Sequence, residues 1–208
     1  IFDKKGALLT GADVKTAIVT LEGLGVDGIG LNCGLGPDQM LVLLKEMTKY
    51  SSIPIFIQPN AGLPVSVNGE TVYNVTPEEF AEKQLKILEN GACALGGCCG
   101  TNPMHIKAMI DLCKGREIKE IAKKNYTAVS SYSKSVFFEG KPIIVGERIN
   151  PTGKKILKEA LRNNDMDYIF REGVSQTDLG ADILDVNVGL PEIDECEMMT
   201  NAVTGLQS

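Results

Sequence analysis

The sequence predicts an α/β fold with parallel strands, because strand and helix patterns alternate along it. Three short apolar runs each lead into a glycine-rich turn and then, directly or after an insertion, into a helical pattern; the runs are residues 26–31, 54–58 and 92–95. Such alternation is typical of βαβ units, whose strands lie parallel in one sheet. The runs are apolar almost throughout, which predicts strands that are covered on both faces.

The turns between these runs predict where helices begin and end. Helices are expected over residues 38–50, 77–90 and 103–114. The second has the clearest start, since Thr76 is a favourable N-cap, Pro77 suits the first helical position and Glu79 completes a capping box. Gly91 then provides a stop. Ahead of this helix, Asn68-Gly69 predicts the turn of a short hairpin between residues 65–67 and 71–75.

The alternation breaks between residues 115 and 141, where serines and five lysines gather. We expect a connector there, helical in part of its first half. A second βα pattern follows, with strands expected at residues 142–145 and 182–188 and helices at 155–162 and 166–179. Two strands do not bury a core by themselves. The sequence is therefore expected to be a piece of a longer protein.

Composition and charge narrow the function classes. The chain has 208 residues and a formal net charge of −6, which disfavours a nucleic-acid partner or an anionic membrane surface. No apolar stretch approaches the ~20 residues of a membrane helix, and the first residues lack a signal-peptide core. A cytoplasmic, reducing location is expected, in which the six cysteines are free thiols, metal ligands or nucleophiles.

Three of the cysteines carry the strongest chemical signal. Cys33 follows the first apolar run, and Cys98 and Cys99 follow the third. If these strands are parallel and separated by one strand, all three thiols meet at one edge of the sheet. Three thiolates suit zinc, and three protein ligands with a fourth position open are typical of catalytic zinc. The alternative is that they are buried apolar cysteines. The first interpretation predicts sulfur atoms within ~4 Å of one another and ~2.3 Å from zinc.

Two further polar residues fall near this predicted centre. Asn60 follows the middle strand, so its side chain should lie beside the metal as a weak neutral ligand that a thiolate can displace. Its alternative role is to stabilise the turn at residues 59–62. His105, the only histidine, could be a zinc ligand, but a partly solvated position on a helix surface is the expected one.

A second polar group falls at the strand ends of the later βα pattern. Its members are carboxylates and amides, together with one arginine: Glu147, Arg148, Asn150, Asp185 and Asn187. Paired donors and acceptors of this kind suit a polar heterocycle. The alternative is that some of them only cap helices or form loops.

The motifs resemble two known families in succession. The runs GLNCGLGP (residues 30–37), PNAG (59–62) and GGCCGT (96–101) resemble the zinc barrel of the homocysteine S-methyltransferase family. The runs GERINPTG (146–153) and LDVNVG (184–189) resemble the start of the pterin-binding barrel of methyltetrahydrofolate:corrinoid methyltransferases. The two in this order resemble the cobalamin-dependent methionine synthases.

This resemblance implies parts of two (β/α)₈ TIM barrels. Residues 1–114 would be the C-terminal part of a homocysteine-binding domain, 115–141 a linker, and 142–208 the N-terminal part of a pterin-binding domain. Zinc on Cys33, Cys98 and Cys99 would activate the homocysteine thiol. Methyltetrahydrofolate would be the methyl donor, and cobalamin would be bound by a domain outside this chain. The resemblance assigns Asn60, Glu147, Asn150, Asp185 and Asn187 to substrate binding, and this piece alone is expected to be inactive.

Two other functions remain open from the sequence. One is a corrinoid-independent homocysteine S-methyltransferase, which would need only the first barrel. The other is a non-catalytic zinc-binding structural module, which would supply a fourth protein ligand to the metal.

Overall fold

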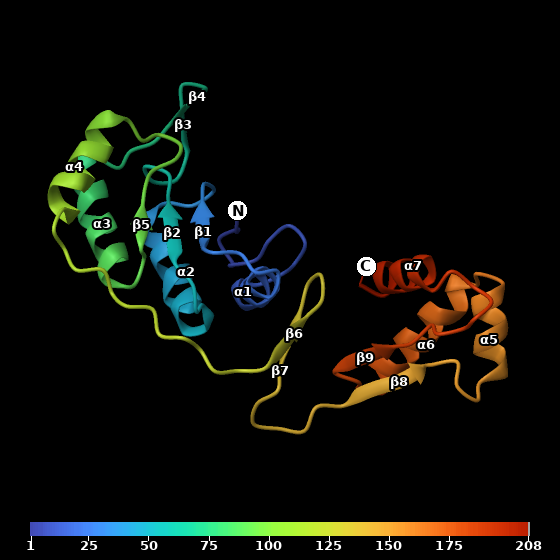
Figure 1. Cartoon of the computed structure of the whole chain (residues 1–208). Coiled ribbons are helices and arrows are strands. Elements are labelled where there is room, and N and C mark those ends of the chain that lie inside the picture. The colour runs from blue at the N-terminus through green and yellow to red at the C-terminus, as the bar shows by residue number, and fades with distance from the viewer. Residues whose placement is uncertain (208) are drawn as a thin grey trace. The chain divides into compact units, whose positions relative to one another are not determined.

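The computed structural model describes residues 1–207, which fold into two compact units. The first unit comprises residues 1–125 and 129–135, and the second comprises residues 126–128 and 136 onward. Both are mixtures of helices and parallel strands, which confirms the α/β prediction (Figure 1). Within residues 1–207, no helix combines the length and hydropathy that crossing a bilayer requires.

A three-stranded parallel sheet organises the first unit. Its strands are β1 (Ile29–Asn32), β2 (Ile55–Gln58) and β5 (Ala94–Leu95), in the spatial order β1-β2-β5. Its helices are α1 (Val14–Gly23), α2 (Pro37–Tyr50), α3 (Pro77–Glu89) and α4 (Pro103–Cys113). The middle strand therefore separates the strand before Cys33 from the strand before Cys98, as the sequence predicted.

Only one face of this sheet is covered. Alternate residues of β1 and β2, such as Leu31 and Ile57, are buried with apolar residues of α2 and α3 in one hydrophobic core. The residues between them are exposed, and Phe56 keeps 41% of its surface accessible. The prediction that both faces are covered is therefore wrong for this sheet in the structure described.

The capping box of α3 forms as predicted. The Thr76 side chain accepts a hydrogen bond from the Glu79 backbone N–H, and the Glu79 side chain accepts one from the Thr76 N–H. Ahead of this helix, β3 (Val65–Val67) and β4 (Glu70–Val72) form the predicted hairpin around Asn68, whose φ of 53° is the left-handed conformation of such turns. Figure 1 shows this hairpin at the end of the sheet toward which β1, β2 and β5 point.

The connector differs from its prediction. Residues 116–127 are neither helix nor strand, so the expected helical segment is absent there. Instead, β6 (Ala128–Ser130) and β7 (Ser135–Phe137) pair in a hairpin. The hydroxyls at its tip explain its position, because those of Ser135 and Ser130 form hydrogen bonds with the hydroxyls of Thr16 and Thr20 in α1. Such contacts between distant segments leave no periodic pattern in the sequence.

The second unit is built on two parallel strands, β8 (Val145–Ile149) and β9 (Ile183–Val186). Its helices are α5 (Lys155–Arg162), α6 (Met166–Asp178) and α7 (Glu195–Gln207). The first strand lies later than the predicted residues 142–145, because the segment interpreted as a turn continues the strand. The prediction also missed α1 and α7. Gly205 allows α7 to approach α6, since a Cβ at that position would lie 2.1 Å from the Phe170 ring.

Candidate metal centre

Three cysteine sulfur atoms meet at the carboxyl ends of β1 and β5. Cys33 directly follows β1, and Cys98 and Cys99 lie in the loop after β5. All three sulfur atoms lie within 4.8 Å of one another, and those of Cys33 and Cys99 are 3.6 Å apart. The cysteines are free thiols. The topology thus brings together the three residues that the sequence singled out.

The backbone at Cys33 adopts a conformation that the residue type does not favour. Its φ is 63°, in the left-handed region, and Gly34 follows with a φ of 79°. This conformation costs an L-residue roughly 1–2 kcal/mol, and such strain gathers at functional sites. In the loop that carries Cys98 and Cys99, Gly100 also has a positive φ, whereas Gly96 and Gly97 allow the close approach of the Gln58 and Thr101 side chains.

This strain predicts that glycine at position 33 gives a more stable protein than alanine, the reverse of the usual order. The metal-free Cys33→Gly variant is expected to be more stable than metal-free Cys33→Ala by about 1 kcal/mol, because glycine adopts a positive φ without the Cβ penalty. Denaturant unfolding of both variants in the presence of a chelator measures the difference. Equal stabilities, or a more stable alanine variant, would show that the Cys33 backbone relaxes at no cost.

Asn60 joins the two cysteine-bearing loops. It is buried, with 3% of its surface exposed, and its Oδ1 accepts a hydrogen bond of 3.1 Å from the Cys99 backbone N–H. Backbone hydrogen bonds on either side strengthen this connection, from the Cys98 N–H to the Pro59 oxygen and from the Ala61 N–H to the Cys99 oxygen. Asn60 therefore lies beside the cysteines as expected, with its oxygen directed at a peptide group. Its action on a metal-bound thiol stays a prediction.

The Cys33 and Cys98 thiols differ in acidity. Hydrogen bonds from the Cys98 and Cys99 thiols, followed by one from the Gly34 N–H, hold the pKa of Cys33 below its usual range. Burial, together with the neighbouring Cys33, raises the pKa of Cys98 to about 11. Cys33 therefore ionises before Cys98. Three thiolates this close would repel one another without a cation between them.

The distances fit a zinc ion. Tetrahedral zinc with bonds of about 2.3 Å holds its sulfur ligands about 3.8 Å apart. The 3.6 Å between Cys33 and Cys99 is close to that value, and the 4.8 Å limit for the whole group requires only small side-chain adjustments. Among residues 1–207, no further histidine, cysteine, aspartate or glutamate joins this group.

His105 is neither a ligand nor a surface residue. It is 5% exposed, so the expectation of a partly solvated position is wrong. Nε2 lies 2.9 Å from the Val75 carbonyl, which can only accept, so Nε2 carries the hydrogen and donates it. Nδ1 then accepts from the Asn102 backbone N–H at 3.3 Å, in a capping box that begins α4. Both ring nitrogens are thus engaged in structure.

Comparison with known proteins gives the family. Residues 1–113, more than half of the chain, match the homocysteine S-methyltransferase family. The chain belongs to this family. The match confirms the resemblance drawn from the cysteine and glycine runs of the first half.

Similarity to known proteins extends further along this methyltransferase-family chain than the family match does. It is 36% identical over 192 residues to the methionine synthase of Mycobacterium leprae (strain TN), and 35% identical over 186 residues to that of Mycobacterium tuberculosis (strain ATCC 25618 / H37Rv). Each match covers 88% of this chain but 16% of the relative. The chain thus spans about one sixth of the length of these relatives, and the similarity continues well beyond Cys113.

The predicted residues of the second unit lie on or just after its two strands. Glu147 is within β8 and Asp185 within β9, and both are exposed. Asn150 and Asn187 directly follow the paired ends of these strands, so they share one edge of the sheet. Asn150 accepts a hydrogen bond from the Thr152 N–H and Asn187 one from the Gly189 N–H, so each also forms its own turn.

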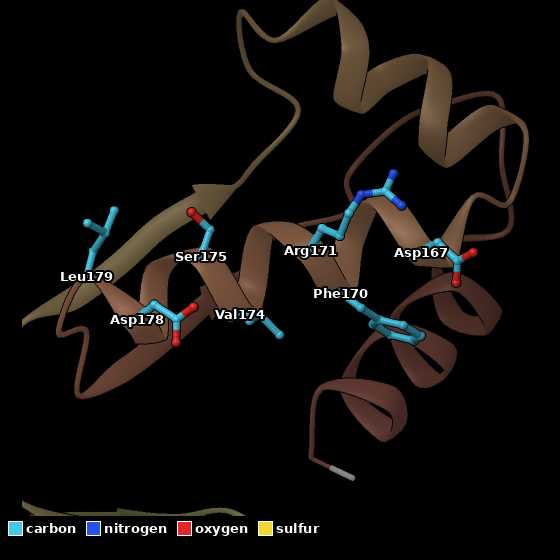
Figure 2. Close-up of a pocket in the computed structure, with 7 residues that line it drawn as sticks. All are labelled: Asp167, Phe170, Arg171, Val174, Ser175, Asp178 and Leu179. Atoms are coloured by element: carbon cyan, nitrogen blue, oxygen red, sulfur yellow. The ribbon is translucent and has the colours of Figure 1, made fainter.

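A hollow on the surface of the second unit lies elsewhere. Figure 2 shows it along α6, where the side chains of Phe170, Arg171 and Val174 contribute to its lining. None of the predicted site residues lines this hollow. It is shallow and follows a single helix, so we assign no site to it.

Proposed function

We propose that this chain carries the homocysteine-binding zinc site and the start of the pterin-binding module of a cobalamin-dependent methionine synthase. In that enzyme a methyl group passes from methyltetrahydrofolate, through cobalamin, to the thiol of homocysteine and gives methionine. The observation that carries the proposal is the convergence of Cys33, Cys98 and Cys99 within 4.8 Å, in a chain of the homocysteine S-methyltransferase family.

The donor set suits a catalytic rather than a structural metal. Cys33, Cys98 and Cys99 would hold zinc, and structural zinc sites almost always have four protein ligands. A bound zinc ion would supply Lewis acidity, which keeps a substrate thiol ionised near neutral pH although the pKa of a free thiol is ~8.5. Cys99 is the most exposed of the three cysteines, so the open side of the group faces solvent and a small thiol can reach it.

The surrounding residues would fix the ligands in place. Asn60 holds the Cys99 peptide, and the backbone of β2 and its following loop holds Cys33 and Cys98 through the Gln58 and Pro59 oxygens. Such contacts set ligand orientation before substrate arrives. We propose that Asn60 also acts on the incoming thiol, as the resemblance implies.

The second unit supports methyltetrahydrofolate as the methyl donor. Its carboxylates and amides, Glu147, Asp185, Asn150 and Asn187, suit the paired donors and acceptors of a pterin ring. We propose that these strands begin a pterin-binding barrel, that the first unit belongs to a homocysteine-binding barrel, and that cobalamin is bound outside this chain. A corrinoid-independent enzyme would need only the first unit, whereas similarity to methionine synthases continues beyond Cys113.

X-ray absorption at the zinc edge tests this function. The zinc-loaded chain is expected to show three sulfur neighbours plus one lighter atom, and to change to four sulfur neighbours on addition of homocysteine. Homoserine, which has a hydroxyl in place of the thiol, is the control and should leave the spectrum unchanged. Four sulfur neighbours before substrate, or no response to homocysteine, would instead indicate a structural metal, and failure to bind zinc would refute the proposal.

A further inference from the structure

A glutamine lies in the apolar core of the first unit. Gln84 is on α3, and none of its surface is exposed. The other buried residues of this helix are apolar: Phe80, Ala81, Ile87 and Leu88. An amide in such a core costs free energy unless it is hydrogen-bonded, whereas a methionine of similar length would fill the same space without that cost. Packing alone therefore does not explain a glutamine at this position.

The Gln84 amide is bonded to the loop that carries two of the cysteines. Its Nε2 donates a hydrogen bond of 2.6 Å to the Gly96 oxygen. Since a carbonyl oxygen can only accept, this bond also fixes which end of the amide faces the loop. The Gly96 N–H in turn donates to the Ile57 oxygen of β2 at 3.0 Å. Both polar groups of the Gly96 backbone are thus held, one by the sheet and one by α3.

The other end of the amide adds no stability. Among residues 1–207, no donor is bonded to the buried Gln84 Oε1. An unsatisfied buried oxygen is destabilising, and in native proteins such an atom is rare enough to require an explanation. The hydrogen bond to Gly96 is therefore the benefit that we assign to this side chain.

The Gly96 peptide leads directly into the cysteine pair. Two residues later, the Cys98 N–H donates to the Pro59 oxygen at 2.8 Å, and the Cys98 oxygen accepts from the Thr101 hydroxyl at 2.7 Å. Gly97 has no room for a side chain, because a Cβ there would lie 2.6 Å from Thr101 Cγ2. The loop is thus closely held after Gly97, and the bond from α3 holds it before that point. A displaced Gly96 carbonyl would move the backbone that carries Cys98.

We propose that Gln84 is a positioning residue of the cysteine centre, whose amide holds the Gly96 carbonyl and so sets where the loop places the Cys98 sulfur. This inference rests on the proposed function, since it assumes that the cysteines bind metal. Groups that orient metal ligands typically contribute about 10–100-fold to metal affinity. Gln84 acts through the backbone rather than on a sulfur atom, so the lower value is expected.

The test replaces Gln84 with methionine in the full chain. Gln84→Met keeps the length of the side chain and removes both the bond to Gly96 and the unsatisfied oxygen. We expect its zinc dissociation constant, measured by chelator competition, to rise about tenfold. The midpoint of denaturant unfolding of the metal-free chain should stay the same or rise. With cobalt(II) in place of zinc, the visible ligand-field bands should shift, because the sulfur atoms lie at different angles around the metal.

Ile87→Val is the matched control. Ile87 is fully buried on the same helix, three residues after Gln84, and its side chain packs in the apolar core. Shortening it should lower the unfolding midpoint through a small cavity but leave zinc affinity and the cobalt bands equal to those of the parent. The two variants are thus expected to show opposite patterns, which a merely structural role of Gln84 would not produce.

Each other outcome contradicts the proposal. A Gln84→Met variant with the affinity and bands of the parent would overturn the inference, while zinc binding by the parent upheld the proposed function. An unfolding midpoint that falls together with affinity, or a variant that does not fold, would show that the amide supports the whole unit and would also overturn the inference. A parent that binds no zinc would overturn both. Amide exchange of residues 96–101 in the metal-free chain gives a second measurement, and rates no faster in Gln84→Met than in the parent would again count against the inference.

Discussion

Zinc affinity is expected to fall at least a hundredfold when Cys98 is replaced by alanine. The contacts around a metal ligand are typically worth about 10–100-fold in affinity, so removal of one of three ligands should cost no less than the upper value. Zinc content of the purified chain and chelator competition measure the effect. Cys93→Ala is the matched control, because Cys93 immediately precedes β5, at the opposite end from Cys98. One zinc per chain in Cys98→Ala, or its loss in Cys93→Ala, would contradict the assignment.

Cys98 also gives this prediction a pH dependence. Metal binding displaces the proton from each thiol ligand, so apparent affinity rises with pH below the pKa of the metal-free thiol. The pKa of Cys98 is raised to about 11, so its proton is still displaced at any pH near neutral. The slope of log affinity against pH should therefore decrease by about one unit in Cys98→Ala. A slope equal to that of the parent would show that Cys98 is not deprotonated on binding.

The parts of this fold that could be predicted from the sequence are those that depend on short motifs or on the order of the strands. The start of α3 follows from Thr76 and Glu79, which contact each other within one helical turn. The meeting of the cysteines follows from parallel topology alone, because ligands after β1 and β5 reach the same edge of the sheet. The cysteine cluster could therefore be predicted from the motifs and the parallel topology.

The rest of the fold and of the site depends on contacts between residues far apart in the sequence, which leave no local pattern. The positive φ of Cys33 is imposed by its surroundings, since cysteine does not favour it. Strand β8 was placed too early because its exposed Glu147 and Arg148 are typical of a turn. The burial of His105 follows from partners in α3 and in the segment before it, at sequence separations of 25 and 30 residues.

Phe80→Ala should produce the largest loss of stability in the first unit. The Phe80 side chain is fully buried on α3, and truncation of a buried phenylalanine typically costs about 3–5 kcal/mol through lost burial and a residual cavity. Hydrogen–deuterium exchange over Pro77–Glu89 measures the local free energy of opening. Phe138→Ala, at a position 44% exposed, is the control and should change stability by no more than about 0.5 kcal/mol.

The Phe80→Ala substitution should also lower the affinity of the cysteine cluster for zinc. Phe80 packs edge-on against His105, and His105 donates a hydrogen bond to the Val75 carbonyl. The Val75 N–H donates in turn to Ala61, whose own N–H is bonded to the Cys99 oxygen. A cavity at Phe80 lets the imidazole move, so the segment at Val75 loses one of its two attachments. We therefore expect zinc affinity to fall in Phe80→Ala but to change no further when His105→Ala is added, because both act through the hydrogen bond to Val75. Fully additive losses in the double variant would mean that Phe80 supports the cysteines by another route.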